Sequence, residues 1–218
     1  MIFFDLDGPL LDVSERYQIL HRDLIEAMRG TPLTPNIYWQ RKRQRCPEAA
    51  ILEELGVSEL EPSYSRRRLE LIETDKYLAY DRLWPWTRPV LTTLIARYTL
   101  ILVTVRSNRE ALERQLTRLN LRRFFKAILS ESATNPVEAQ KARLIHDYLS
   151  PQDLPTRGSW IIGDTEADIG AGRLLGMTTV AVRCGIRDDE QLARMAPNYL
   201  IDDIRVLPDL MSRKDCAG

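Results

Sequence analysis

The fold class follows from the first eight residues, MIFFDLDG (residues 1–8). The apolar run predicts a buried strand that ends on two carboxylates and a glycine. Side chains alternate along a strand, so Asp5 and Asp7 are expected to point the same way, with Leu6 opposite. Ligands of open α/β sheets bind beyond the carboxyl ends of strands, where two acids repel each other unless a cation or a shared proton relieves them. The pattern indicates a hard metal ion, Mg²⁺, and a phosphorylated substrate, with an ordinary Asp-Gly turn as the alternative.

Further short β-rich runs follow, with helical patterns between them. The expected strands lie at residues 100–105, 127–130, 160–164, 179–182 and, more weakly, 199–202. Apolar residues at helical spacing predict helices over residues 109–121, 140–149 and 168–175. Near-continuous Val/Ile/Leu strands that alternate with helices predict an α/β fold with a parallel sheet covered on both faces.

Residues 13–83 differ from the rest because they contain no convincing strand. They predict amphipathic helices at residues 14–29, 47–55 and 65–79, with Ser14 as an N-cap and an interruption at the two prolines of residues 31–35. This helical insert of about seventy residues is longer than an ordinary crossover connection. It would lie over the two aspartates like a lid, and residues 84–89, which contain two prolines, are expected to lead back to the core.

Composition excludes several classes of partner. The 31 basic and 31 acidic residues cancel, so the net charge gives no reason to expect binding to nucleic acid or to a membrane. The composition is compatible with a monomer or a homodimer. The basic clusters at residues 41–45 and 66–68 are interpreted as solvated helix faces. Cys46, Cys184 and Cys216 show neither disulfide nor metal-ligand spacing. With no signal peptide and no apolar stretch near the roughly 20 residues that span a bilayer, a cytoplasmic protein is expected.

Polar residues also follow the other expected strands. Thr104 ends the second strand, where its hydroxyl and the backbone amides at the start of the next helix could bind a phosphoryl oxygen. Asp164 and Asp168 follow the fourth strand and face the same way if a helix starts there. Lys141 offers a compact positive charge near a phosphoryl group, with Lys126 as the alternative.

These residues together resemble the four motifs of the haloacid dehalogenase-like hydrolase superfamily, in its phosphoglycolate-phosphatase-like branch. In family order, the motifs are Asp5-Leu6-Asp7-Gly8, Thr104, Lys141, and Gly163-Asp164 with Asp168. The resemblance covers the whole chain and implies a Rossmann-like parallel sheet core at residues 1–12 and 84–218 with an inserted all-α cap domain at residues 13–83. The chain departs from the family at Pro9, where threonine is usual, and at Ala142, where proline is usual. Proline fixes φ, so the turn beneath the cap is expected to be stiffer.

The resemblance also implies roles. Asp5 corresponds to the nucleophile that forms an aspartyl-phosphate, and Asp7 to the general acid and base. Mg²⁺ would be held by the Asp5 carboxylate, the Asp7 backbone carbonyl and Asp164. Thr104 and Lys141 would bind the transferring phosphoryl group.

Other residues have competing interpretations. Asp168 would either reach the metal through water or orient Lys141 without contacting the metal directly, and this indirect role is favoured. Asp168 could also be an ordinary acid in the first turn of a helix, and Thr104 a hydroxyl that satisfies the backbone. Five side chains could meet the leaving group, and nothing in the sequence ranks them: Tyr17, His21, Arg41, Arg45 and Arg106.

The expected activity is Mg²⁺-dependent hydrolysis of a small phosphomonoester, phosphoglycolate-like or a sugar phosphate, through an aspartyl-phosphate. Haloacid dehalogenases and phosphonoacetaldehyde hydrolases lack an acid at the position of Asp7, which disfavours both. The alternatives are phosphoryl transfer of the β-phosphoglucomutase kind and a catalytically reduced protein that only binds or regulates.

Overall fold

The computed structural model describes residues 1–134 and 136–215. Cys216 lies outside the described residues, and Cys46 and Cys184 are free thiols. No helix in the described part of the chain is both long enough and apolar enough to cross a membrane.

A six-stranded sheet forms the core, and all its pairings are parallel. In spatial order the strands are β5 (Ala127–Ser130), β4 (Leu100–Thr104), β1 (Ile2–Phe4), β6 (Trp160–Gly163), β7 (Thr178–Val182) and β8 (Tyr199–Ile201). β1 lies at the centre, with Ile2 beside both Leu100 and Trp160. All six strands predicted from the sequence are present, so the α/β fold with a parallel sheet is confirmed.

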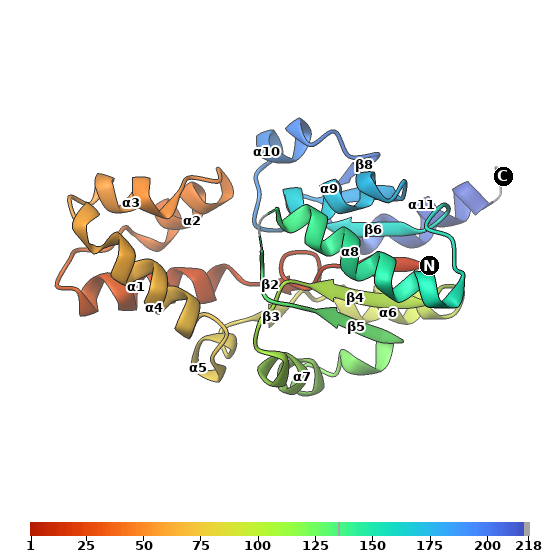
Figure 1. Cartoon of the computed structure of the whole chain (residues 1–218), viewed down its shortest axis with the longest axis horizontal. Coiled ribbons are helices and arrows are strands. Elements are labelled where there is room, and N and C mark those ends of the chain that lie inside the picture. The colour runs from red at the N-terminus through yellow and green to blue at the C-terminus, as the bar shows by residue number, and fades with distance from the viewer. Residues whose placement is uncertain (135, 216–218) are drawn as a thin grey trace.

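Helices cover both faces of this sheet (Figure 1). They are α6 (Thr87–Ile95), α7 (Arg109–Arg118), α8 (Val137–Leu149), α9 (Glu166–Leu174), α10 (Asp189–Arg194) and α11 (Leu207–Asp215). Along β1, Ile2 and Phe4 enter an apolar cluster with residues of α6, α7 and α11, whereas Phe3 enters a second cluster with α8 and α9. The alternation of side chains along a strand thus supplies both cores.

The helical insert has an apolar core of its own and lies to one side of the sheet (Figure 1). Its helices are α1 (Ser14–Ala27), α2 (Pro35–Arg43), α3 (Glu48–Glu54), α4 (Glu61–Leu71) and α5 (Asp75–Leu78). Short 3₁₀ turns complete the structure: η1 (Ser58–Leu60), η2 (Arg122–Phe124), η3 (Ser150–Gln152) and η4 (Ile204–Val206). A two-stranded antiparallel ribbon, β2 (Leu11–Asp12) and β3 (Arg82–Leu83), links the insert to the core.

Several local predictions for the insert are wrong. Residues 65–79 are not one helix but parts of α4 and α5, and β3 is a strand inside the region expected to have none. The interruption expected at residues 31–35 is present, because no helix lies between α1 and α2, and Pro35 itself opens α2, where a missing N–H costs nothing. Val13 rather than Ser14 is the N-cap of α1, and the Ser14 N–H donates instead to Asp12 Oδ1 at 2.9 Å. The expected linker at residues 84–89 already contains the start of α6 at Thr87.

Candidate active site

The loop after β1 places the first two acids at the carboxyl edge of the sheet. Asp5 still donates its N–H to Ile162 O at 2.9 Å, and the chain then turns at Gly8, whose φ of 98° favours glycine. A Cβ at Gly8 would overlap the Asp164 carboxylate, so this turn brings two strand ends into contact. The backbone bonds of the turn are donated by Gly8, Leu10 and Leu11. Pro9 removes none of these bonds, which explains how this departure from the family pattern is accommodated.

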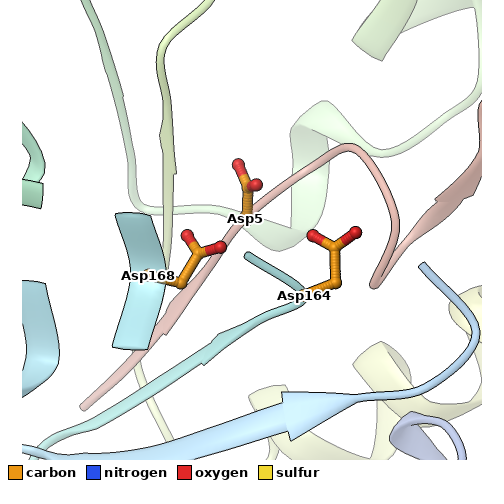
Figure 2. A group of neighbouring side chains, drawn as sticks. All are labelled: Asp5, Asp164 and Asp168. Carbon is orange, nitrogen blue, oxygen red and sulfur yellow. The ribbon is translucent and has the colours of Figure 1, made fainter. Parts of the chain in front are cut away.

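Three buried carboxylates converge at this edge. Asp5 follows β1, Asp164 follows β6 and Asp168 lies in the first turn of α9 (Figure 2). One oxygen from each lies within 4.8 Å of the others. Lys141, from α8, is fully buried beside them, with Nζ 3.1 Å from Asp5 Oδ1 and 2.5 Å from Asp168 Oδ1. Three carboxylates around one ammonium group leave an excess of negative charge that favours a bound cation.

Asp168 is held in place by two sets of contacts. Its Oδ1 accepts from Lys141, and its Oδ2 accepts from the Thr165 N–H at 3.1 Å and the Thr165 hydroxyl at 2.7 Å. The bond from the Thr165 N–H is one half of the capping box that begins α9. The structure therefore contains both the expected contact with Lys141 and the expected acid in the first turn of a helix. The two oxygens of Asp168 thus already accept three hydrogen bonds.

Asp164 differs from Asp168 in the hydrogen bonding of its carboxylate oxygens. Its Oδ2 accepts the Ile186 N–H, but its Oδ1 is buried and has no hydrogen-bond partner within residues 1–134 and 136–215. Burial, together with Asp5 and Asp168, raises the pKa of Asp164 well above its ordinary value. A Cβ at Gly185 would overlap this carboxylate, as one at Gly8 would. The two glycines make room for this carboxylate, and its unpartnered buried oxygen fits a hard cation such as Mg²⁺.

The nucleophile candidate has a raised proton affinity in this setting. Burial raises the pKa of Asp5 to about 7, against the opposing effect of Lys141, and the neighbouring Asp168 and Asp7 add to the rise. A cation at the three carboxylates would reverse much of this rise, because it favours the ionised form.

The Asp7 carboxylate is paired with two arginines, whereas that of Asp5 is paired with Lys141. Arg16 Nη2 lies 2.6 Å from Asp7 Oδ2, and Arg106 contacts both oxygens, at 3.1 Å through Nε and 2.6 Å through Nη2. Burial would raise the pKa of Asp7, but Arg106 and Arg16 outweigh it and hold that pKa well below its ordinary value. Arg16 also lies 3.2 Å from Asp81, which is fully buried just before β3.

A cavity of about 750 Å³ lies between the insert and the carboxyl edge of the sheet. Of the residues predicted to bind or react, the cavity wall includes Asp5, Asp7, Thr104 and Lys141. The insert and the adjacent loops contribute cationic and aromatic side chains to the wall: Arg16, Tyr17, Lys42, Arg45, Arg68, Arg106 and Arg187.

Two of the five leaving-group candidates are absent from this wall. His21 stacks on Tyr38 with ring centroids 4.0 Å apart and bonds to the Tyr64 hydroxyl at 3.0 Å, inside the insert. Arg41 pairs with Glu54 on the surface of the insert. The interpretation of the basic clusters as solvated faces is also wrong in part, because Lys42 and Arg68 face the cavity.

Two expectations around the phosphoryl site need correction. The amides of Ser107 and Asn108 already donate to Glu73 of the insert, at 3.1 and 2.6 Å, so a phosphoryl oxygen would have to displace this carboxylate. Lys126 lies at the opposite edge of the sheet, where its N–H bonds to Leu100 O at the start of β4. Lys126 is therefore excluded as the alternative to Lys141.

Known proteins resemble this chain along nearly its whole length. The family model for haloacid dehalogenase-like hydrolases matches residues 2–182. A phosphoglycolate phosphatase of Synechococcus elongatus is 23% identical over 203 residues, which cover 92% of each protein. A phosphoglycolate phosphatase of Pseudomonas fluorescens is 24% identical over 224 residues, covering 95% of this chain and 78% of that protein. Among solved structures, a haloacid dehalogenase-like family protein of Streptococcus pneumoniae has a TM-score of 0.76 at 21% identity, covers 94% of this chain and 95% of its own, and shows the same fold.

Proposed function

The chain belongs to the haloacid dehalogenase-like hydrolase family, and on that premise we propose that it is a Mg²⁺-dependent phosphatase acting on a small phosphomonoester. The observation that carries the proposal is the position of Asp5 on the cavity wall, against Lys141 and near the Asp164 carboxylate, whose Oδ1 has no hydrogen-bond partner among the described residues. The two relatives named phosphoglycolate phosphatase support 2-phosphoglycolate, or a related small ester, as the substrate.

The reaction divides into two displacements at phosphorus. In the first, a carboxylate oxygen of Asp5 attacks phosphorus, the ester P–O bond breaks, and Asp7 gives its proton to the leaving oxygen. In the second, Asp7 takes a proton from water, whose oxygen attacks the aspartyl-phosphate. Inorganic phosphate leaves and the Asp5 carboxylate is restored.

The two arginines on Asp7 bear on both steps. A carboxylate held by two guanidinium groups is a good base and a poor acid, because those groups favour its ionised form. Both Arg16 and Arg106 line the cavity, where an anionic substrate competes with Asp7 for them. We therefore expect Asp7 to gain its proton only after the substrate has drawn positive charge away from it.

The cation and the phosphoryl group are assigned as follows. Mg²⁺ would be held by the carboxylates of Asp5 and Asp164 and by the backbone carbonyl of Asp7, and when bound it would offset charge on the phosphoryl oxygens. Thr104 and Lys141 would hold the phosphoryl group. Asp168 would keep the Lys141 ammonium in position.

Residues 13–83 would act as the cap over a catalytic core made of residues 1–12 and 84–218. Two contacts between the insert and the core support this division. Arg43 of α2 donates to the carbonyls of Arg183 and Arg187 at 2.9 and 3.0 Å, and Glu73 accepts from Ser107 and Asn108. These contacts hold the insert against the core on two sides of the cavity, where it would limit the access of bulk water to the reacting groups.

Phosphate release from a panel of phosphomonoesters tests the proposal. We expect turnover that requires Mg²⁺ and is abolished by Asp5→Asn, whereas Asp209→Asn, at an exposed position of α11, leaves it unchanged. Turnover retained in Asp5→Asn would contradict the nucleophile assignment. Conversion of β-glucose 1-phosphate into glucose 6-phosphate would instead favour phosphoryl transfer, and no turnover of any ester by folded protein would favour a binding role.

A further inference from the structure

The positive charges around the cavity are unevenly balanced by carboxylates. Around Asp7, Arg16 of the insert and Arg106 of the core face Asp7 and Asp81, so two guanidinium groups meet two carboxylates. Lys141 is outnumbered by the carboxylates around it. The remaining cations of the cavity wall form two groups, Lys42 and Arg68 around Glu48, and Arg45 and Arg187 around Glu166.

Lys42 of α2 and Arg68 of α4 share a single carboxylate. Lys42 Nζ lies 2.9 Å from Glu48 Oε1, and Arg68 Nε lies 3.5 Å from the same oxygen. The other oxygen of Glu48 accepts from the Tyr64 hydroxyl at 3.3 Å. The side chains of Lys42, Arg68 and Glu48 are only 16 to 18% exposed, so water screens the excess positive charge poorly.

Both cations are also gathered over one aromatic ring. The Tyr17 ring centroid lies 5.2 Å from Lys42 Nζ and 5.6 Å from the Arg68 guanidinium carbon. Arg68 Nε is buried and makes no hydrogen bond within the described residues. Burial and the neighbouring Arg68 lower the pKa of Lys42 to about 8. A cation pair that is buried, mutually repelling and short of acceptors is set up to receive an anion.

The position of this pair relative to the reacting groups indicates which part of the substrate it meets. Tyr17 follows Arg16, whose guanidinium contacts Asp7 and lies 5.2 Å from the Tyr17 ring centroid. Asp7 is the group that would protonate the leaving oxygen, so the ring and the two cations lie toward the leaving part of the substrate. A second excess charge, at Arg45 and Arg187 around Glu166, is less suited to this role because Arg45 is 59% exposed.

We propose that Lys42 and Arg68, held by Glu48 over the ring of Tyr17, bind a second anionic group on the leaving part of the substrate. The substrate class is then a phosphomonoester whose alcohol carries a carboxylate or a second phosphate, rather than a neutral sugar or polyol. This assignment rests on the proposed phosphatase function and deepens it.

Three esters that differ at one carbon test the assignment. Glycerol 1-phosphate has a neutral leaving group, 3-phosphoglycerate replaces its CH₂OH with a carboxylate, and glycerol 1,3-bisphosphate adds a second phosphate. With Mg²⁺ present, we expect kcat/KM for at least one anionic ester to exceed that for glycerol 1-phosphate by about tenfold or more. The ester that is preferred distinguishes a carboxylate ligand from a phosphate ligand.

Arg68→Gln and its matched controls separate recognition from folding. Arg68→Gln should lower kcat/KM for the preferred anionic ester by about tenfold, mainly through KM, and lower kcat/KM for glycerol 1-phosphate by a much smaller factor. Arg68→Lys should restore part of the loss. Arg67→Gln, at the preceding position of α4, which is exposed, should behave like the unaltered protein. Equal kcat/KM for all three esters, or an equal loss on all three in Arg68→Gln, would overturn the assignment.

A binding measurement tests the anion subsite at Lys42 and Arg68 independently of the proposed phosphatase activity. In Asp5→Asn with Mg²⁺, calorimetry should show tighter binding of the preferred anionic ester than of glycerol 1-phosphate, and Arg68→Gln should remove that difference. If no ester is turned over but the difference in binding persists, the proposed function fails and the anion subsite stands. If turnover is present without any difference in binding, the subsite fails and the phosphatase stands.

Discussion

Acid should destabilise this protein through His21, a residue of the insert core. The ring is 1% exposed, stacked on Tyr38 and bonded to the Tyr64 hydroxyl, and its Nε2 has no hydrogen-bond partner among the described residues. Burial lowers the pKa of His21 from an ordinary 6.5 to about 4, against a smaller opposing effect of Glu48. Between these values the unfolded chain binds a proton that the folded chain does not, so stability is lost as the pH falls.

The size of the effect follows from the two pKa values. The free energy of unfolding should fall by about 2.5 kcal/mol between pH 7.5 and pH 4.5 on account of His21 alone. Other groups also titrate over this range, so the measurable quantity is the difference between the unaltered protein and His21→Phe, which keeps the aromatic stacking.

Urea unfolding at the two pH values measures that difference. His21→Phe should lose about 2.5 kcal/mol less stability on acidification than the unaltered protein. His146→Gln, at a histidine that is 63% exposed, serves as the matched control and should show no such protection. If His21→Phe and the unaltered protein lose stability equally, His21 is not buried in its neutral form.

Two further predictions follow from close contacts in the site. Gly185→Ala would place a Cβ against the Asp164 carboxylate, so Mg²⁺ affinity measured by calorimetry should fall by about tenfold or more; unchanged affinity would exclude Asp164 as a ligand. Arg16→Gln would leave buried Asp7 and Asp81 with less positive charge and should lower the free energy of unfolding by about 3 kcal/mol in denaturant titrations. In the double variant Arg16→Gln/Asp81→Asn, part of that loss should be recovered. If the effects of the two substitutions on the free energy of unfolding simply add, Arg16 and Asp81 do not interact.

The sheet could be predicted because its strands carry their own signal. Residues 100–104 are apolar except for the last and are buried throughout, and the run is too short for a helix. The helices of the insert were harder to predict, because proline can either begin a helix or break one, depending on its position. Pro35 and Pro62 both occupy the first turns of helices, where proline is favoured, although the same residue inside a helix would break it.

The residues of the site likewise include some that the sequence predicts and some that it does not. Asp5, Thr104, Lys141 and Asp164 come directly from strand ends or from the helices that follow them, so their convergence follows from the topology of a parallel sheet. Arg16 was missed because it lies on an amphipathic helix where a charged residue is expected to face water. Its burial depends on Asp7 and Asp81, which lie far from each other in the sequence. The orientation of Lys42 and Arg68 likewise depends on how α2 and α4 pack.

The central claim is that Asp5 carries the phosphoryl group during turnover, and labelling of that residue tests it most directly. The protein would be mixed with Mg²⁺ and a substrate ester, quenched in acid within the first turnover, and digested for mass spectrometry. We expect one phosphoryl group on the peptide that contains Asp5, and none in Asp5→Asn. Rapid phosphate release without any phosphorylated Asp5 peptide, or the same release from Asp5→Asn, would contradict the account.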